Sequence, residues 1–126
     1  MLAHHEAIAN LAVKDLERAR RFYQDTLGLQ PIGAEGDELL VFQAGTAKLF
    51  VYRSDLAGTN QATALSWIVG DPIEDEVRAL AAHGVRFEHY RDLPGLRIEG
   101  DLHVAEGMKI AWFKDPDGNI LSLVTG

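Results

Sequence analysis

Residues 111–124 read Ala-Trp-Phe-Lys-Asp-Pro-Asp-Gly-Asn-Ile-Leu-Ser-Leu-Val, which is two apolar runs joined by a short polar stretch. In that stretch, proline fixes one φ angle, aspartate can accept hydrogen bonds from the backbone that follows, and glycine tolerates a left-handed conformation. The pattern predicts a β-hairpin with a three-residue loop and a glycine bulge. In that register Phe113 pairs with Leu121, and Trp112 stands beside Ser122.

An internal repeat organises the rest of the chain. Val13-x-Asp15 recurs as Val69-x-Asp71, and Gly28-Leu29 recurs at the same interval as Gly84-Val85. In each half, an apolar run precedes an aspartate that can cap a helix, and glycine follows the last helical turn. Each half therefore predicts a strand, a helix and three strands. This is an α+β fold, with one module at about residues 1–57 and another at about residues 58–126.

Composition limits the possible functions. The 126 residues are enough for one domain, and the absence of cysteine excludes disulfides, thiolate metal sites and cysteine nucleophiles. The net charge is −7 and no uncompensated Lys/Arg cluster stands against it, so nucleic acid is not an expected partner. No apolar run reaches membrane-spanning length, so we expect a soluble, cytoplasmic protein.

Two sequence motifs resemble those of one known superfamily. The chain is similar to the vicinal oxygen chelate superfamily, which includes glyoxalases, bleomycin-resistance proteins and ring-cleaving dioxygenases. The resemblance implies two βαβββ modules whose mixed sheet curves around a central cleft, commonly in a homodimer. It rests on Ala9-x-Leu11-x-Val13-x-Asp15-Leu16-x-x-Ala19-x-x-Phe22-Tyr23-x-x-x-Leu27-Gly28-Leu29 and Phe113-x-Asp115-Pro116-Asp117-Gly118-Asn119-x-Leu121-x-Leu123.

The same resemblance implies where a metal would bind. Metal-using members hold a divalent ion on four side chains, one on the first strand and one on the last strand of each module. Those positions correspond here to Ile8 and Phe50 in the first module and to Ala64 and Ser122 in the second. Isoleucine, alanine and phenylalanine offer no lone pair, and a serine hydroxyl is a poor ligand for such ions. We therefore expect no metal and no other cofactor.

Strand alternation predicts which side chains line the cleft, because residues two apart share a face. The predicted set is apolar and aromatic with few polar groups, as in many small-molecule pockets. Filling of the space by these side chains alone is the alternative. Arg97 is added because its guanidinium could bind an anionic group, although pairing with nearby acids is also open. The candidate ligand-binding residues are Ile8, Asn10, Phe50, Tyr52, Ser66, Trp112, Ser122 and Arg97.

His103 lies in the long segment 91–107, which we interpret as a functional or mobile loop. Among the neighbouring acids Glu99, Asp101 and Glu106, it could act as a general base oriented by a carboxylate. The competing interpretation, which we favour, is an exposed loop histidine.

Three functions remain open. The leading hypothesis is a metal-independent protein that binds an apolar or aromatic small molecule, similar to the drug-sequestering resistance proteins. The second is a metal-independent lyase or isomerase that uses His103 or a loop carboxylate. The third is a non-catalytic regulatory or assembly module.

Overall fold

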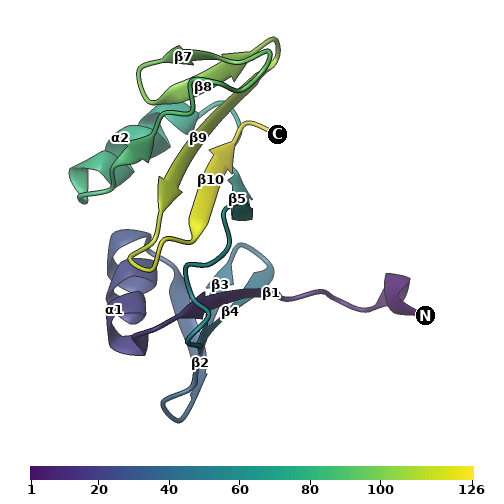
Figure 1. The fold of residues 1–126 in the computed structure, drawn as a ribbon. Coiled ribbons are helices and arrows are strands. Elements are labelled where there is room, and N and C mark those ends of the chain that lie inside the picture. Colours follow the sequence, from purple (N-terminus) through teal and green to yellow (C-terminus); the bar gives the residue numbers. More distant parts are fainter. The chain divides into compact units, whose positions relative to one another are not determined.

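The computed structural model describes all 126 residues, and the chain forms two compact units, Met1–Thr59 and Asn60–Gly126. Each unit contains a β-sheet with a helical segment beside it, and we describe each unit by itself (Figure 1). No helix has the length and hydropathy needed to cross a membrane.

The first unit is a four-stranded sheet in the order β1-β4-β3-β2. β1 runs parallel to β4, and the other pairs are antiparallel. A 3-10 turn, η1 (Leu2–His4), precedes the sheet of this unit at the end of an extended N-terminal segment (Figure 1). The remaining elements are β1 (Ala9–Val13), α1 (Leu16–Arg20), the π-helix η2 (Arg21–Thr26), β2 (Gln30–Glu35), β3 (Leu39–Ala44) and β4 (Ala47–Arg53).

Local signals fix the helical segment of this unit. The carboxylate of Asp15 accepts the backbone N–H of Arg18 at 3.1 Å, which caps α1 as predicted. Gly28 ends the segment with φ at +77°, a conformation that costs glycine little. The buried face carries Ala19 and Tyr23, and Tyr23 packs against Phe42 of β3 with ring centroids 6.0 Å apart.

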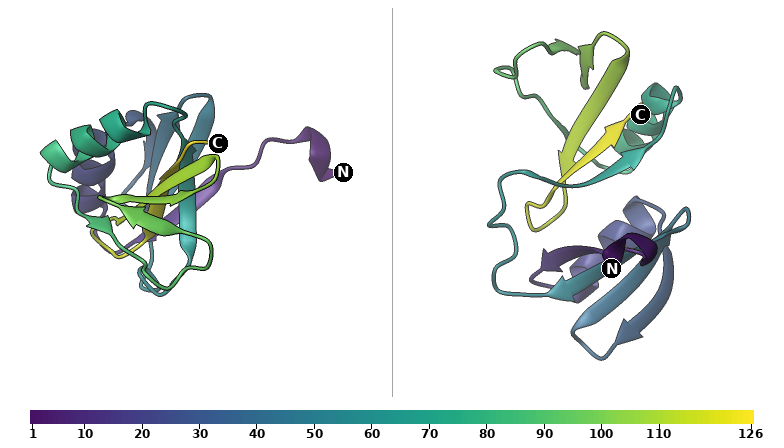
Figure 2. Two further views of the ribbon diagram at one scale, coloured as in Figure 1. Left: turned by 90° about the horizontal axis from the view of Figure 1, so that it is seen from above. Right: turned by 90° about the vertical axis from the view of Figure 1, so that its right-hand side faces the viewer.

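The second unit repeats this order around a sheet arranged β5-β10-β9-β8-β7, with β6 also paired to β9. β5 runs parallel to β10, as β1 does to β4 in the first unit. Figure 2 shows α2 along one side of this sheet. The elements are β5 (Thr63–Ile68), α2 (Ile73–Ala82), β6 (Phe87–Glu88), β7 (Arg97–Glu99), β8 (Leu102–Ala105), β9 (Met108–Lys114) and β10 (Ile120–Val124). The predicted α+β fold with two βαβββ modules is confirmed.

The closing hairpin has the predicted register. Leu121 pairs with Phe113, and Ser122 pairs with Trp112. The backbone N–H of Asp115 donates to the carbonyl of Asn119 at 3.0 Å, so the loop between them has three residues. Gly118 takes the left-handed position with φ at +90°.

The segment 91–107 differs from its prediction as a loop. It contains β7 and β8, an antiparallel pair that extends the sheet beyond β9. The two strands have only three and four residues, and Pro94, Gly95 and Gly100 interrupt the surrounding sequence. Such short runs carry too little alternation to indicate strands without their partners.

Candidate functional site

One face of the second sheet carries the candidate residues of that unit, with the exception of Arg97. Cross-strand partners project to the same side of a sheet, so register defines the face. One row runs Ser66, Ser122 and Trp112 across β5, β10 and β9. The next row, two residues along each strand, holds Ile68, Val124, Ile110 and His103. We call these seven residues, together with Tyr90, the Trp112 face.

The two serines in the first row are bonded to each other. Their Oγ atoms lie 2.6 Å apart, and either hydroxyl can be the donor. Ser122 is almost completely buried, with 2% of its surface exposed, whereas Ser66 is exposed. The hydroxyl of Ser122 is thus occupied by a neighbour on the adjacent strand and is shielded from solvent.

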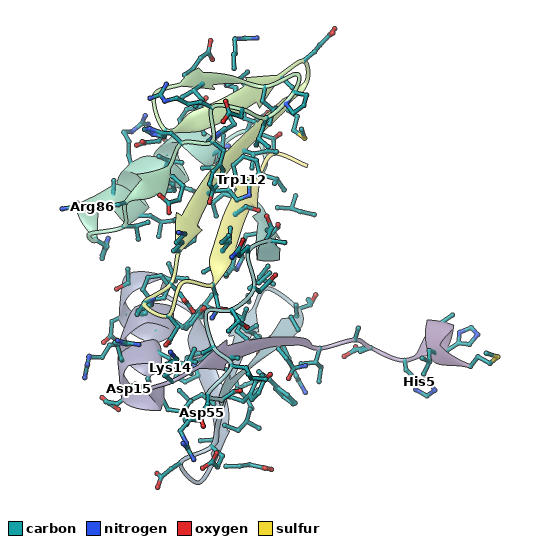
Figure 3. All side chains as sticks on the ribbon, in the orientation of Figure 1. His5, Lys14, Asp15, Asp55, Arg86 and Trp112 are labelled. Atoms are coloured by element: carbon teal, nitrogen blue, oxygen red, sulfur yellow. The ribbon has the colours of Figure 1, made fainter.

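Trp112, which is labelled in Figure 3, is half-buried and anchors an aromatic cluster. Its Nε1–H donates to Thr63 Oγ1 at 3.0 Å. Its ring meets that of His103 edge-on with centroids 4.7 Å apart, and that of Tyr90 at 5.3 Å. Aromatic pairs at these separations are favourable, so the cluster holds the indole in one orientation.

His103 is fully buried on β8, and the interpretation of an exposed loop histidine is therefore wrong. Its Nε2 accepts the backbone N–H of Tyr90 at 2.8 Å. An imidazole nitrogen that accepts a hydrogen bond carries no proton, so the ring is neutral with its proton on Nδ1. Burial lowers the pKa of His103, and the nearby His89 lowers it further.

The predicted carboxylate partner of His103 does not orient it. Asp101 instead contacts His89, with Oδ1 2.9 Å from Nε2. Glu99 pairs with Arg97 at 3.2 Å. The lone pair that a general base would use is occupied by the Tyr90 amide, which gives His103 a structural bond rather than a free basic site.

Tyr90 belongs to this cluster, although sequence reasoning did not single it out. Burial raises the pKa of its phenol, with a smaller contribution from Glu88. Its hydroxyl is buried without a hydrogen-bond partner. Buried polar atoms are rarely left unbonded, so this hydroxyl is an exception within the second unit. The only sequence signal was an aromatic residue directly before the long segment.

Arg97 is not brought together with the other candidates of this unit. It pairs across β7 and β8 with Val104, whose partner on β9 is Lys109. That row is offset by one residue from His103 and Ile110, so it projects to the opposite face of the sheet. Its guanidinium is exposed and engaged by Glu99.

The first unit has a corresponding row on β1 and β4. Asn10 pairs with Phe50, and Tyr52 lies two residues further along β4 on the same face. Ile8 directly precedes β1, and its carbonyl accepts from Asn10 Nδ2 at 3.4 Å. Leu49 and Val51, which flank Phe50, are buried against the helical side, while Ile8 and Tyr52 are 38% and 39% exposed.

The sequence matches a family model over nearly its whole length. The model is described as the Glyoxalase/Bleomycin resistance protein/Dioxygenase superfamily, and it covers residues 3–123. The chain therefore belongs to this superfamily, as the motifs predicted. No curated protein matches the sequence.

Solved structures with this fold include named enzymes and resistance proteins. The lactoylglutathione lyase of Agrobacterium tumefaciens is 18% identical with a TM-score of 0.71, over 98% of this chain and 95% of that one. The fosfomycin resistance protein FosX of Mesorhizobium loti is 16% identical with a TM-score of 0.69, over 100% and 94%. A FosX variant of Listeria monocytogenes, solved with Mn(II) and 1S,2S-dihydroxypropylphosphonic acid, is 20% identical with a TM-score of 0.70, over 100% and 92%. At these identities the likeness shows the fold alone.

The residues at the four metal positions implied by the superfamily do not fit a divalent ion. Ile8, Phe50 and Ala64 have no donor atom, and the only oxygen, on Ser122, is bonded to Ser66. Nowhere in the structure do three His, Cys, Asp or Glu side chains gather in a way that could hold a metal ion.

Proposed function

We propose that this chain is a metal-independent small-molecule-binding protein of the superfamily, and that it holds an apolar or aromatic ligand against the Trp112 face. The observation that carries the proposal is the state of Ser122. Where the resemblance implies a metal-binding carboxylate, the chain has a buried hydroxyl that already bonds Ser66 at 2.6 Å. A ligand here is therefore expected to bind without a bridging ion.

The composition of the face supports an apolar ligand. Its second row offers Val124 and Ile110, both half-buried, and Ile68, which is 78% exposed. Exposed apolar side chains beside a fixed aromatic ring are typical of surfaces that bind small apolar molecules.

The row of Asn10, Phe50 and Tyr52 in the first unit presents two aromatic rings and one amide and is partly exposed, and Ile8 stands beside it. Its residues occupy the positions in their module that Ser66, Ser122 and neighbouring residues occupy in theirs. We extend the proposal to this row as a second ligand-contacting surface. Its contribution is measured independently with Phe50→Ala.

The relatives give the contrast that makes the test informative. One FosX structure holds Mn(II), so metal use occurs within this fold. A lyase or isomerase mechanism through His103 gains no support, since its Nε2 is bonded to the Tyr90 amide.

Probe binding tests the proposal. N-phenylnaphthylamine is a neutral aromatic probe whose fluorescence rises in apolar surroundings. We expect it to bind the wild-type protein equally with and without EDTA. Trp112→Ala should weaken binding about tenfold, because it removes the aromatic surface of the face.

Trp67→Phe is the matched control. Trp67 alternates to the other side of the same sheet and stacks on Phe113 with centroids 6.3 Å apart, so its replacement should leave binding unchanged. If EDTA abolishes binding and a divalent ion restores it, the proposed metal independence is wrong. If Trp112→Ala binds the probe as Trp67→Phe does, the assignment of the face is wrong.

A further inference from the structure

The strand that neighbours β9 on the side away from β10 is interrupted. Phe87 and Glu88 of β6 pair with one end of β9, and residues 103–105 of β8 pair with its other end. Residues 89–101 leave the sheet edge between these two pairings and contain β7. We call residues 89–101 the excursion.

Two side-chain contacts close the neck of the excursion, and both involve histidine. The Tyr90 amide at its start donates to Nε2 of His103, two residues after its end, at 2.8 Å. His89 and Asp101, its first and last residues, are joined by the 2.9 Å contact between Nε2 and Oδ1. The first contact is fully buried at His103, whereas the second lies at the exposed surface.

The two contacts respond to protonation in opposite ways. A protonated imidazole donates from both nitrogens, so His103 in that form would present N–H to the N–H of Tyr90. The bond would then be lost and a charge would be buried beside the ring of Trp112. Protonation of His89, by contrast, would place a cation against the carboxylate of Asp101 and strengthen that contact.

We propose that His103 is a positioning residue for the Trp112 face: its neutral ring holds Tyr90 against Trp112, and protonation releases Tyr90 and weakens ligand binding there. The edge-on contact of Trp112 with His103 and the contact of Trp112 with Tyr90 make both rings part of one support. The pH dependence concerns the proposed binding face and therefore rests on the proposed function.

The charged groups around His103 leave no carboxylate to stabilise its protonated form. Asp101 lies at the neck of the excursion, and its carboxylate contacts His89. Glu88 lies on β6, and its carboxylate pairs with Lys114 of β9 at 3.2 Å. The imidazole of His89 also faces His103 and lowers its pKa, while the backbone of its β9 partner Ile110 raises it. The rings of Tyr90 and Trp112 contact His103 as well. The lowered pKa of His103 agrees with this uncompensated burial.

The first test needs no ligand. Nitrogen NMR of the wild-type protein should show His103 with its proton on Nδ1 at neutral pH. As the pH falls from about 8 to about 5, the protection factor of the Tyr90 amide should drop about tenfold, in step with protonation of His103. The fluorescence of Trp112, read in the Trp67→Phe background, should change with the same midpoint. A proton on Nε2 at neutral pH would overturn the proposal without any variant.

Two variants separate this role from a merely structural one. In His103→Gln, the side-chain carbonyl can accept the Tyr90 amide but does not titrate, so the pH dependence of the Tyr90 amide and of N-phenylnaphthylamine binding should vanish, whatever the affinity of the variant at neutral pH. In His89→Gln the pH profile should remain. If His103→Gln keeps the wild-type profile, or if His89→Gln abolishes it, the inference is wrong. A pH-dependent Tyr90 amide in a protein that does not bind the probe would instead refute the proposed function and leave the His103 bond established.

Discussion

Replacing the two serines of the Trp112 face one at a time should have unequal effects on stability. Ser66→Ala removes the partner of the Ser122 hydroxyl, which is buried with 2% of its residue surface exposed. Ser122→Ala leaves the Ser66 hydroxyl, but Ser66 is exposed and can bond to water instead. The structure therefore predicts that the substitution at the more exposed position is the more damaging.

The magnitudes follow from what each variant leaves unbonded. A buried hydroxyl without a partner costs about 1–3 kcal/mol, so Ser66→Ala should destabilise the second unit by about 2 kcal/mol. Ser122→Ala loses only the net worth of one hydrogen bond, about 1 kcal/mol or less. The double variant leaves no orphan and should also cost about 1 kcal/mol, so the two single effects exceed the double by about 2 kcal/mol.

Urea unfolding followed by tryptophan fluorescence measures these differences. Both tryptophans, Trp67 and Trp112, lie in the second unit, so the signal reports that unit. Equal or reversed costs for Ser66→Ala and Ser122→Ala, or simple additivity in the double variant, would show that Ser122 is not a hydroxyl satisfied by its neighbour. Ser122 would then have to be considered again as a side chain whose hydroxyl is free to coordinate a metal ion.

Three further predictions concern the turn, acid stability and assembly. Asp115→Ala should destabilise the second unit by about 2–4 kcal/mol in the same assay, because its carboxylate accepts from Asp117 N, Asn119 N and Asn119 Nδ2; Pro116→Ala is the control. Because the pKa of His103 is lowered in the folded protein, the unfolded chain binds a proton there more readily below about pH 6.5. The free energy of unfolding should therefore decrease as the pH falls below that value, by up to about 1.4 kcal/mol per pH unit. His103→Gln should remove this pH dependence of the free energy of unfolding. We also propose the homodimer that the resemblance implies, and sedimentation equilibrium should give twice the chain mass; a monomer mass at micromolar concentration would refute it.

Much of the fold could be predicted because its signals are local. The cap at Asp15, the glycine at Gly28 and the turn after Asp115 each act within a few residues, and all three form as predicted. The pairing of Ser122 with Trp112 followed from the loop length, since a hairpin loop fixes the register of both strands.

The surroundings of His103 could not be predicted because they depend on distant partners. A histidine among acids, next to glycines, has the composition of a loop. Its burial arises from pairing with Ile110 and from the rings of Tyr90 and Trp112. These contacts exist only once the chain has left the sheet at Tyr90 and returned to it, an event for which the sequence carries no local signal.

The two modules share the order of their strands and helix, yet only the second gathers aromatic rings and hydrogen-bonded polar side chains on one face of its sheet. In the first unit the strand next to β3 is β2, a single strand from Gln30 to Glu35 whose pairing is irregular only between Pro31 and Gly33. In the second, the equivalent edge is interrupted, and the return of the chain places the Tyr90 amide on His103. We infer that this interruption gives the second module the arrangement of Tyr90, His103 and Trp112 that the first module lacks. A continuous edge strand would bond its amides to β9 and leave His103 without the contact that fixes its tautomer. With hydroxyls instead of metal ligands beside it, the proposed binding face would derive its selectivity from the orientation of its rings, which we propose that the His103 bond controls.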